Sequence, residues 1–148
     1  PIYHGVSDEV LRKGVGHIEN TSFPVGGKGT HSVLAGHTGL RRMKIFDDIN
    51  KLDIGDKFYI DVLGENLVYE VDNIKVVDPD DTSAIKVEND KDYVTLVTCT
   101  PRILNTHRLL VRGIRVELTT DSNIETDKTN KTDTEKIQSN TVFSSWNI

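Results

Sequence analysis

Cys99 is the only cysteine of the chain, and it stands at the end of an apolar run that begins at Tyr93. Thr100 and Pro101 follow, so a thiol at the end of a strand can open into a loop. A thiolate becomes a nucleophile when a nearby base or positive charge lowers its pKa. The alternative is an inert thiol, because free cysteine is among the most buried residue types. Composition alone favours the inert thiol, whereas position favours a nucleophile.

His37 is the histidine best placed to serve such a thiol. It ends an apolar run and has Gly36 before it and Gly39 two residues after it. The glycines favour a sharp turn at this strand end, from which an imidazole can project into a groove. Imidazole is suited to acid–base work near neutral pH. The alternative is an exposed turn histidine with no role in chemistry.

An arginine beyond the loop can complete the site, because guanidinium stays charged and can hold a carbonyl oxygen as negative charge develops. Arg108 starts the next apolar run, so in an antiparallel pair it lies opposite the Cys99 strand end. Arg112 has the same parity but lies further along, and His107 points away from the side of Arg108. We choose Arg108. The competing arginines are Arg102, Arg112 and Arg115.

The elements that must position these residues are mostly strands. Alternating apolar and polar residues from Leu67 to Asp72 are typical of a half-buried antiparallel strand. We expect strands over residues 15–20, 31–36, 57–63, 66–77, 93–99 and 108–118, the last two forming a central pair. We expect short helices over 7–14, with Ser7 as N-cap, and over 43–52, and a helical turn near 82–85. The predicted fold is a mostly β, closed barrel with a few short helices.

We predict one folded domain over residues 1–118, followed by a tail over 119–148. Seven Thr, four Ser and four Asn make up half of those last thirty residues, which is typical of a solvated, disordered segment. Trp146 near its end is consistent with the approach to a membrane interface, or with a chain end of no such meaning. Because the chain starts at Pro1 and its only methionine is Met43, we expect an upstream segment to be missing.

Charge and motif content exclude several classes of function. The 148 residues carry 18 basic and 23 acidic side chains, with no basic block, so nucleic acid is not expected as a partner. One cysteine and five histidines without helical pair spacing build no zinc site, so we predict no metal. The acidic residues of 78–81 lack the EF-hand pattern and favour a solvated loop over weak calcium binding. No phosphate-binding loop is present.

Several motifs together resemble the sortase family. They are TLVTC ending at Cys99, GHTGL around His37 and HRLLVRG around Arg108, with Cys99 62 positions after His37 and Arg108 9 after Cys99. Four further segments narrow the resemblance to class C, the pilin-assembling sortases. They are PIYHG, GVGHIENTSFPVGG, DPDDTS and TCTPRILNTHRLLVRG, and the likeness covers about residues 1–118.

The resemblance implies a closed, eight-stranded sortase β-barrel and a cysteine transpeptidase acting on LPXTG-like sorting signals. Cys99 would attack the Thr–Gly carbonyl, His37 would act as acid and base, and Arg108 would stabilise the oxyanion. Thr38 and Thr98, each beside a catalytic residue, would line the substrate groove. No cofactor is implied.

By the same resemblance, the acceptor is a lysine amine of a pilin subunit, and the product is a pilin polymer. The alternatives are a sortase that anchors proteins to peptidoglycan amines, a cysteine hydrolase that uses water, and a binding barrel without activity. The expected location is the extracellular face of the cytoplasmic membrane of a Gram-positive bacterium. The membrane would be reached only through segments outside this chain.

Overall fold

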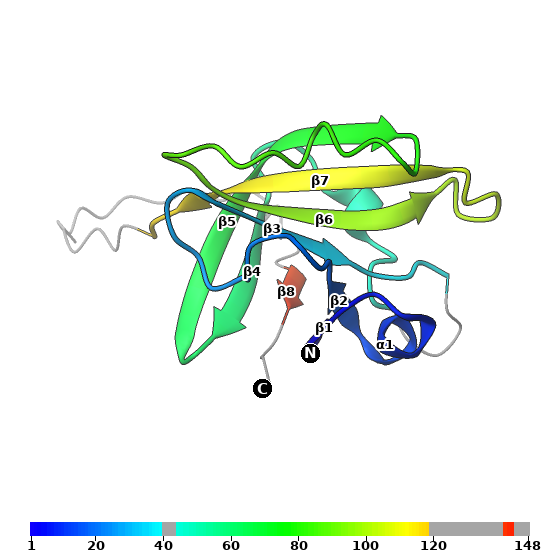
Figure 1. Cartoon of the computed structure of the whole chain (residues 1–148), viewed down its shortest axis with the longest axis horizontal. Helices are drawn as coiled ribbons and strands as arrows, with labels where there is room; N and C mark the ends of the chain where they lie inside the picture. Colours follow the sequence, from blue (N-terminus) through cyan, green and yellow to red (C-terminus); the bar gives the residue numbers. More distant parts are fainter. Residues whose placement is uncertain (40–43, 119–140, 144–148) are drawn as a thin grey trace, which may run out of the picture.

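Strands β6 (Asp92–Thr100) and β7 (His107–Val116) are hydrogen-bonded neighbours at the centre of one curled sheet (Figure 1). The computed structural model describes residues 1–39, 44–118 and 141–143. The other elements are β1 (Ile2–His4), α1 (Asp8–Lys13), β2 (Val15–His17), β3 (Thr30–Ala35), the 3₁₀ helix η1 (Ile49–Lys51), β4 (Lys57–Val62), β5 (Glu65–Val77) and β8 (Thr141–Phe143).

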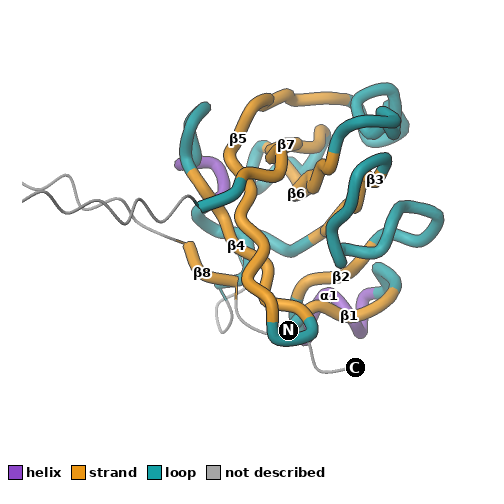
Figure 2. The backbone as a smooth tube through the Cα atoms, turned by 90° about the vertical axis from the view of Figure 1, so that its left-hand side faces the viewer, coloured by secondary structure: helices purple, strands orange, loops and turns teal. Residues whose placement is uncertain are grey.

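The sheet has the strand order β1-β2-β3-β6-β7-β5-β4-β8 and curls on itself, as Figure 2 shows from the side. β6 runs parallel to β3 and antiparallel to β7, which in turn is antiparallel to β5. The predicted central pair and mostly β fold are therefore confirmed. Closure into an eight-stranded barrel is not: within the described residues, β1 and β8 are the two edges of the sheet and are not paired with each other.

The interior of the curled sheet is filled by every second side chain of its strands. In β4, Phe58, Ile60 and Val62 are buried while the residues between them are half-buried, the pattern of a strand with one face on the core. Val94 and Leu96 of β6 face the same core. Each such side chain stabilises the fold by about 1.5–3 kcal/mol through removal of apolar surface from water.

The helical predictions have mixed outcomes. α1 is confirmed, and the Ser7 hydroxyl accepts a hydrogen bond from the Val10 backbone N–H as an N-cap. The amphipathic helix over 43–52 is wrong: within the described residues 44–52, only η1 is helical. Phe46 and Ile49 are nevertheless buried in the core, because an irregular segment can bury the same apolar residues as a helix. Residues 82–85 form a turn closed by the Ile85 N–H and the Thr82 carbonyl.

The prediction for the tail falls mostly outside the described residues. Of residues 119–148, only Thr141–Phe143 are described, and they pair as β8 with β4. A short strand that was not predicted, β1, pairs in parallel with β2. No helix in the part of the chain that the structure describes has the length and apolar content needed to cross a bilayer.

Candidate active site

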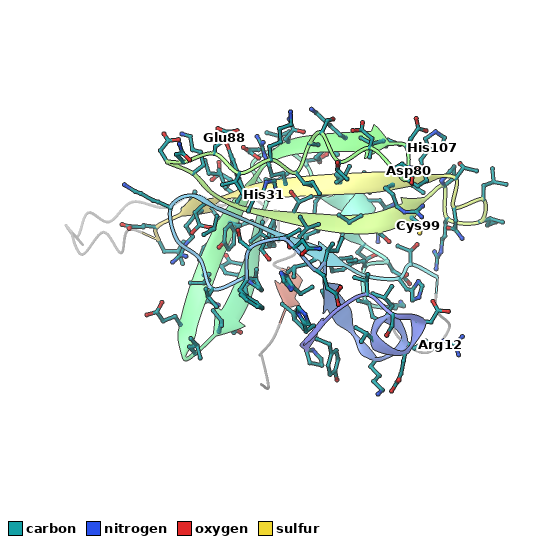
Figure 3. All side chains as sticks on the ribbon, in the orientation of Figure 1. Arg12, His31, Asp80, Glu88, Cys99 and His107 are labelled. Atoms are coloured by element: carbon teal, nitrogen blue, oxygen red, sulfur yellow. The ribbon has the colours of Figure 1, made fainter. Side chains whose placement is uncertain are left out.

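Cys99 and Arg108 are directly opposed across the β6–β7 pair, next to the loop that joins the two strands. Directly opposed residues point to the same face of a sheet, with Cβ atoms about 4.5–5.5 Å apart. Cys99 is a half-buried free thiol outside the core cluster. Figure 3 shows it at the end of the molecule where His107 lies, with His31 and Glu88 further along the sheet. The thiol therefore opens at a strand end, as the sequence predicts.

His37 reaches the same level of the sheet from the other side of β6. The parallel register of β3 and β6 keeps a constant offset of 62 positions from Thr30↔Asp92 to Ala35↔Val97. The contact continues past the strand end, where the Gly36 N–H donates to the Val97 carbonyl at 3.1 Å. Two residues beyond Ala35, the same offset places half-buried His37 level with Cys99.

The strand registers thus align three residues from separate segments, and we call His37, Cys99 and Arg108 the catalytic row because the sequence predicts catalytic roles for them. They lie on the outer face, the face opposite to the core. Among the described residues no hydrogen bond joins the His37 imidazole to the Cys99 thiol. A base, a thiol and a fixed positive charge along one line can support nucleophilic attack on a carbonyl.

The four candidate arginines differ in how their charge is neutralised. Arg108 donates from Nη1 to the backbone carbonyls of Asn105 at 3.2 Å and His107 at 3.0 Å. Within the described ranges no carboxylate lies at ion-pair distance from it. Each competing arginine, in contrast, has a carboxylate partner. The pairs are Arg102–Asp47, Arg112–Asp72 and Arg115–Asp92.

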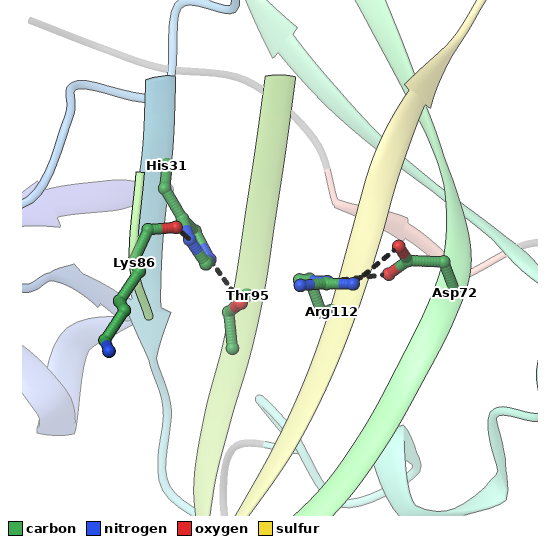
Figure 4. Close-up of polar contacts among 5 residues, drawn as sticks. All are labelled: His31, Asp72, Lys86, Thr95 and Arg112. Carbon is green, nitrogen blue, oxygen red and sulfur yellow. Dashed lines mark hydrogen bonds and ion pairs between the residues drawn. The ribbon is translucent and has the colours of Figure 1, made fainter. Parts of the chain in front are cut away.

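Arg112 illustrates the structural use of guanidinium in this sheet. It pairs with Thr95, four positions along β6 from Cys99, and donates twice to Asp72 at 2.9 Å (Figure 4). Its guanidinium also lies 4.2 Å from the centre of the Tyr93 ring. The hydrogen bonds to Asp72 raise the pKa of Arg112 above its usual value. Arg112 therefore links β7 to β5, and its guanidinium is already paired with a carboxylate.

The two predicted substrate-binding threonines are placed differently. Thr98 is only 4% exposed and faces the interior, where its hydroxyl donates to the Gly36 carbonyl at 2.7 Å. This placement favours a role in holding the Gly36 strand end over a direct contact with substrate in an outer groove. Thr38 is half-buried beside His37, and its role as a substrate contact stays a prediction.

Sequence reasoning missed a hollow on the outer face of the sheet, which lies further along strands β6 and β7 than the catalytic row. It has a volume of about 170 Å³ and lies between strands β5 to β7 and the 78–91 connection. Leu110 lines it, and the Leu110↔Val97 pair is the next on this face after Arg108↔Cys99. Lys75, Lys86 and Glu88 also line it. No sequence pattern marks this hollow, because its walls come from segments that only the fold brings together.

The described residues contain no group of three or more His, Cys, Asp or Glu side chains that could hold a metal ion. His31 is buried, and both of its ring nitrogens have partners: Nδ1 donates to the Lys86 carbonyl at 2.8 Å, and Nε2 accepts from the Thr95 hydroxyl at 2.7 Å (Figure 4). His107 is exposed, with Nε2 3.5 Å from an Asp78 carboxylate oxygen.

The structure is thus a mostly β curled sheet in which a half-buried thiol and a guanidinium oppose each other at one end of the central strand pair. The family model of the sortase domain matches residues 1–116. The chain belongs to the sortase family. Sortase homologues are cysteine transpeptidases, and membership supports an enzyme of this type.

Relatives narrow the family likeness to class C. The chain is similar to the crystal structure of sortase C-1 from Actinomyces oris, with TM-score 0.78, 52% identity and coverage of 80% of this chain and 67% of that one. It is also similar to the Pilus Island 1 sortase C2 of Group B Streptococcus, with TM-score 0.76, 54% identity and coverage of 79% and 66%.

Sortase D of Bacillus subtilis (strain 168) is 34% identical over 101 residues, which are 68% of this chain and 48% of that protein. The chain thus spans about half the length of the curated relatives it matches.

Proposed function

We propose that the protein containing this chain is a cysteine transpeptidase that polymerises pilins. It cleaves an LPXTG-like sorting signal between Thr and Gly and transfers the new acyl end to a lysine amine of another pilin subunit. The observation that carries the proposal is the catalytic row, in which Arg108 is the candidate arginine without a carboxylate partner among the described residues. Its neighbours in the family, sortases C among them, support the same substrate class.

In the first half of the reaction, Cys99 Sγ attacks the carbonyl carbon of the sorting-signal Thr. Arg108 stabilises the negative charge that develops on the carbonyl oxygen, as a fixed donor does in acyl transfer. The C–N bond to Gly then breaks, and protonated His37 gives its proton to the leaving amine. The pilin remains attached to Cys99 as a thioester.

In the second half, a lysine Nζ attacks the thioester carbonyl while His37 takes the proton that the amine loses. The C–S bond breaks, the thiolate of Cys99 is restored, and an isopeptide bond joins the two subunits. The location we propose is the cell surface, with membrane attachment through segments outside this chain.

The test offers the full chain an LPXTG-type donor peptide and two acceptors, a pilin domain with its lysines and an oligoglycine. We expect a thioester adduct at Cys99 by mass spectrometry and transfer to the pilin domain. Cys99→Ala is the control that must abolish both. Preference for oligoglycine contradicts the pilin acceptor, and release of free acid at saturating acceptor contradicts transfer altogether. Absence of an adduct at Cys99 contradicts the cysteine mechanism.

A further inference from the structure

Asp47 is a carboxylate that the proposed chemistry does not use and that is nearly withdrawn from water. Its side chain is only 9% exposed. A carboxylate in such a place needs hydrogen-bond donors or a cation, because loss of hydration strongly disfavours its charge. Oδ1 accepts from the Gly39 backbone N–H at 2.6 Å, and Oδ2 lies 3.4 Å from Nη2 of Arg102. Both partners belong to the segments that carry the catalytic row.

The first partner belongs to the turn that holds His37. Phe46, the residue before Asp47, donates its backbone N–H to the His37 carbonyl at 3.2 Å. Its ring also covers Gly36 so closely that a Cβ there would lie 2.6 Å from it. Residues 46 and 47 therefore attach to the backbone before, at and after His37. Among the described residues the turn is held by these attachments and by the bond from the Gly36 N–H to the Val97 carbonyl, so the direction of the imidazole depends on them.

The second partner belongs to the loop between Cys99 and Arg108. Within that loop the Asn105 N–H donates to the Pro101 carbonyl at 2.8 Å, and the Asn105 carbonyl accepts from the Arg108 guanidinium. Arg102 reaches across to Asp47 from the same loop. A movement of the loop toward or away from Asp47 therefore also moves Asn105, whose carbonyl holds the Arg108 guanidinium.

The two segments already touch at one more point. Gly39 has a φ of +84°, and a Cβ added to it would lie 3.2 Å from Nε of Arg102. Glycine allows both this backbone conformation and the close approach. Asp47 thus lies where the His37 turn and the Cys99–Arg108 loop meet.

We propose that Asp47 is a positioning residue that sets the spacing between His37 and the Cys99–Arg108 pair. The proposal rests on the proposed function, since it assigns a role within that reaction. The contacts of Asp47 with Gly39 and with Arg102 differ in how much they stabilise this arrangement. Arg102 is 65% exposed, and an exposed ion pair contributes little. The bond from Gly39 is the stronger, because at 2.6 Å it is as short as a charge-assisted hydrogen bond, whereas the contact from Arg102 is 3.4 Å long.

The difference between the two contacts predicts how the loss of kcat ranks among three variants. Asp47→Ala removes both contacts and lowers kcat for transfer about 10–100-fold, as misplacement of a catalytic group does. Asp47→Asn keeps an oxygen for the Gly39 N–H, and Arg102→Ala keeps the whole carboxylate, so each loses less than Asp47→Ala. KM for the donor peptide stays within about two-fold, because the proposed reaction gives Asp47 no contact with the donor peptide.

The matched control is Asp48→Asn, which changes the next carboxylate along the chain. Asp48 is 59% exposed and pairs with Lys51 in the same segment, so its removal leaves kcat unchanged. All variants are compared well below their thermal midpoints, where each is folded. A purely structural role for Asp47 lowers the midpoint but does not reduce the kcat of the folded protein.

A second readout does not require transfer to occur. The rate of iodoacetamide alkylation of Cys99 is measured against pH for the unmodified chain, His37→Ala, Asp47→Ala and Asp48→Asn. We expect the profile of Asp47→Ala to move toward that of His37→Ala. If it coincides with the profile of the unmodified chain, or if kcat of Asp47→Ala stays within two-fold, the positioning role is wrong. If the proposed function itself is wrong, the unmodified chain forms no thioester adduct at Cys99.

Discussion

Arg108 differs from the three other candidate arginines in how its guanidinium is held among the described residues. Three of the arginines form an ion pair with a carboxylate: Arg102, Arg112 and Arg115. Among the described residues, Arg108 is held only by backbone carbonyls. Carbonyls orient a guanidinium without cancelling its charge. In the proposed reaction, an oxyanion that develops beside Cys99 would meet a cation that these carbonyls have already oriented.

Replacing Arg108 by alanine should lower kcat for donor cleavage about 10²–10³-fold, the usual cost of removing an oxyanion donor. Folding should change little, since no carboxylate in the described part of the chain loses a partner. Steady-state cleavage of an LPXTG-type peptide measures the effect. Arg115→Ala is the matched control: its pair with Asp92 lies on the side of the sheet away from the thiol, and kcat should be unchanged. An equal loss in both variants would contradict the assignment.

Strand β7 keeps its place at the centre of the sheet partly through Gly113. A Cβ at this position would lie 2.6 Å from the Phe58 ring and 2.8 Å from Cβ of Tyr69. Both neighbours are fully buried and stack on each other with ring centres 5.6 Å apart, so neither can withdraw. The close approach of β7 to the core thus requires a residue without a side chain.

Gly113→Ala should therefore lower the free energy of unfolding by at least about 1–3 kcal/mol, the range for overpacking a core. Urea denaturation followed by circular dichroism measures the change. Phe58→Leu in the same chain makes room, so the double variant should lose less than the sum of the two single variants. Additive losses would contradict the packing explanation.

A second structural feature of the strands is the irregular register of β5 between Val71 and Asn73. Asp72 is the extra residue there, and a bulge redirects the side chain it carries. Its carboxylate meets both donors of Arg112 on β7 (Figure 4). The bulge thus supplies the partner that occupies Arg112 and leaves Arg108 as the unpaired cation of the outer face among the described candidates.

The stability of the whole molecule is linked to pH through His31. This side chain is 1% exposed and joins β3 to β6 and to the connection at Lys86. Burial lowers the pKa of His31 below its usual value of 6.5. Below about pH 6.5 the unfolded chain therefore binds a proton more readily than the folded chain. Stability is fully present above that pH and is lost as the pH falls through the pKa of the folded state.

The urea midpoint should accordingly fall between pH 7 and pH 5, and His31→Gln should show a smaller fall over the same range. The difference between the two chains at each pH isolates the contribution of His31. His107→Gln, which changes an exposed histidine, should follow the unmodified chain. Parallel pH curves for the unmodified chain and His31→Gln would show that burial of this imidazole has no linkage to folding.

Local patterns along the sequence were sufficient for the main strands, and the opposition of Cys99 and Arg108 follows from the pairing of two of them. The catalytic roles of His37, Cys99 and Arg108 stay predictions. The alternation in β4 and β5 reports one buried face, and the short loop between Cys99 and Arg108 makes an antiparallel pair with those residues opposed. The 62-position spacing of His37 and Cys99 equals the register offset of β3 and β6. These features are local or follow from strand pairing, so the sequence carries them directly.

Other features depend on contacts between distant segments, and only the tertiary structure decides them. The apolar spacing over 43–52 also suits an irregular segment packed on a core, so the helix predicted there was wrong. No local pattern indicates that Asp72 and Asp47 neutralise Arg112 and Arg102, since the partners are 40 and 55 residues apart. The sequence alone indicated which residues are candidates for the reaction. Which arginine has no carboxylate partner among the described residues, and which contacts hold the His37 turn, is decided by long-range burial and ion pairing, which depend on the complete fold.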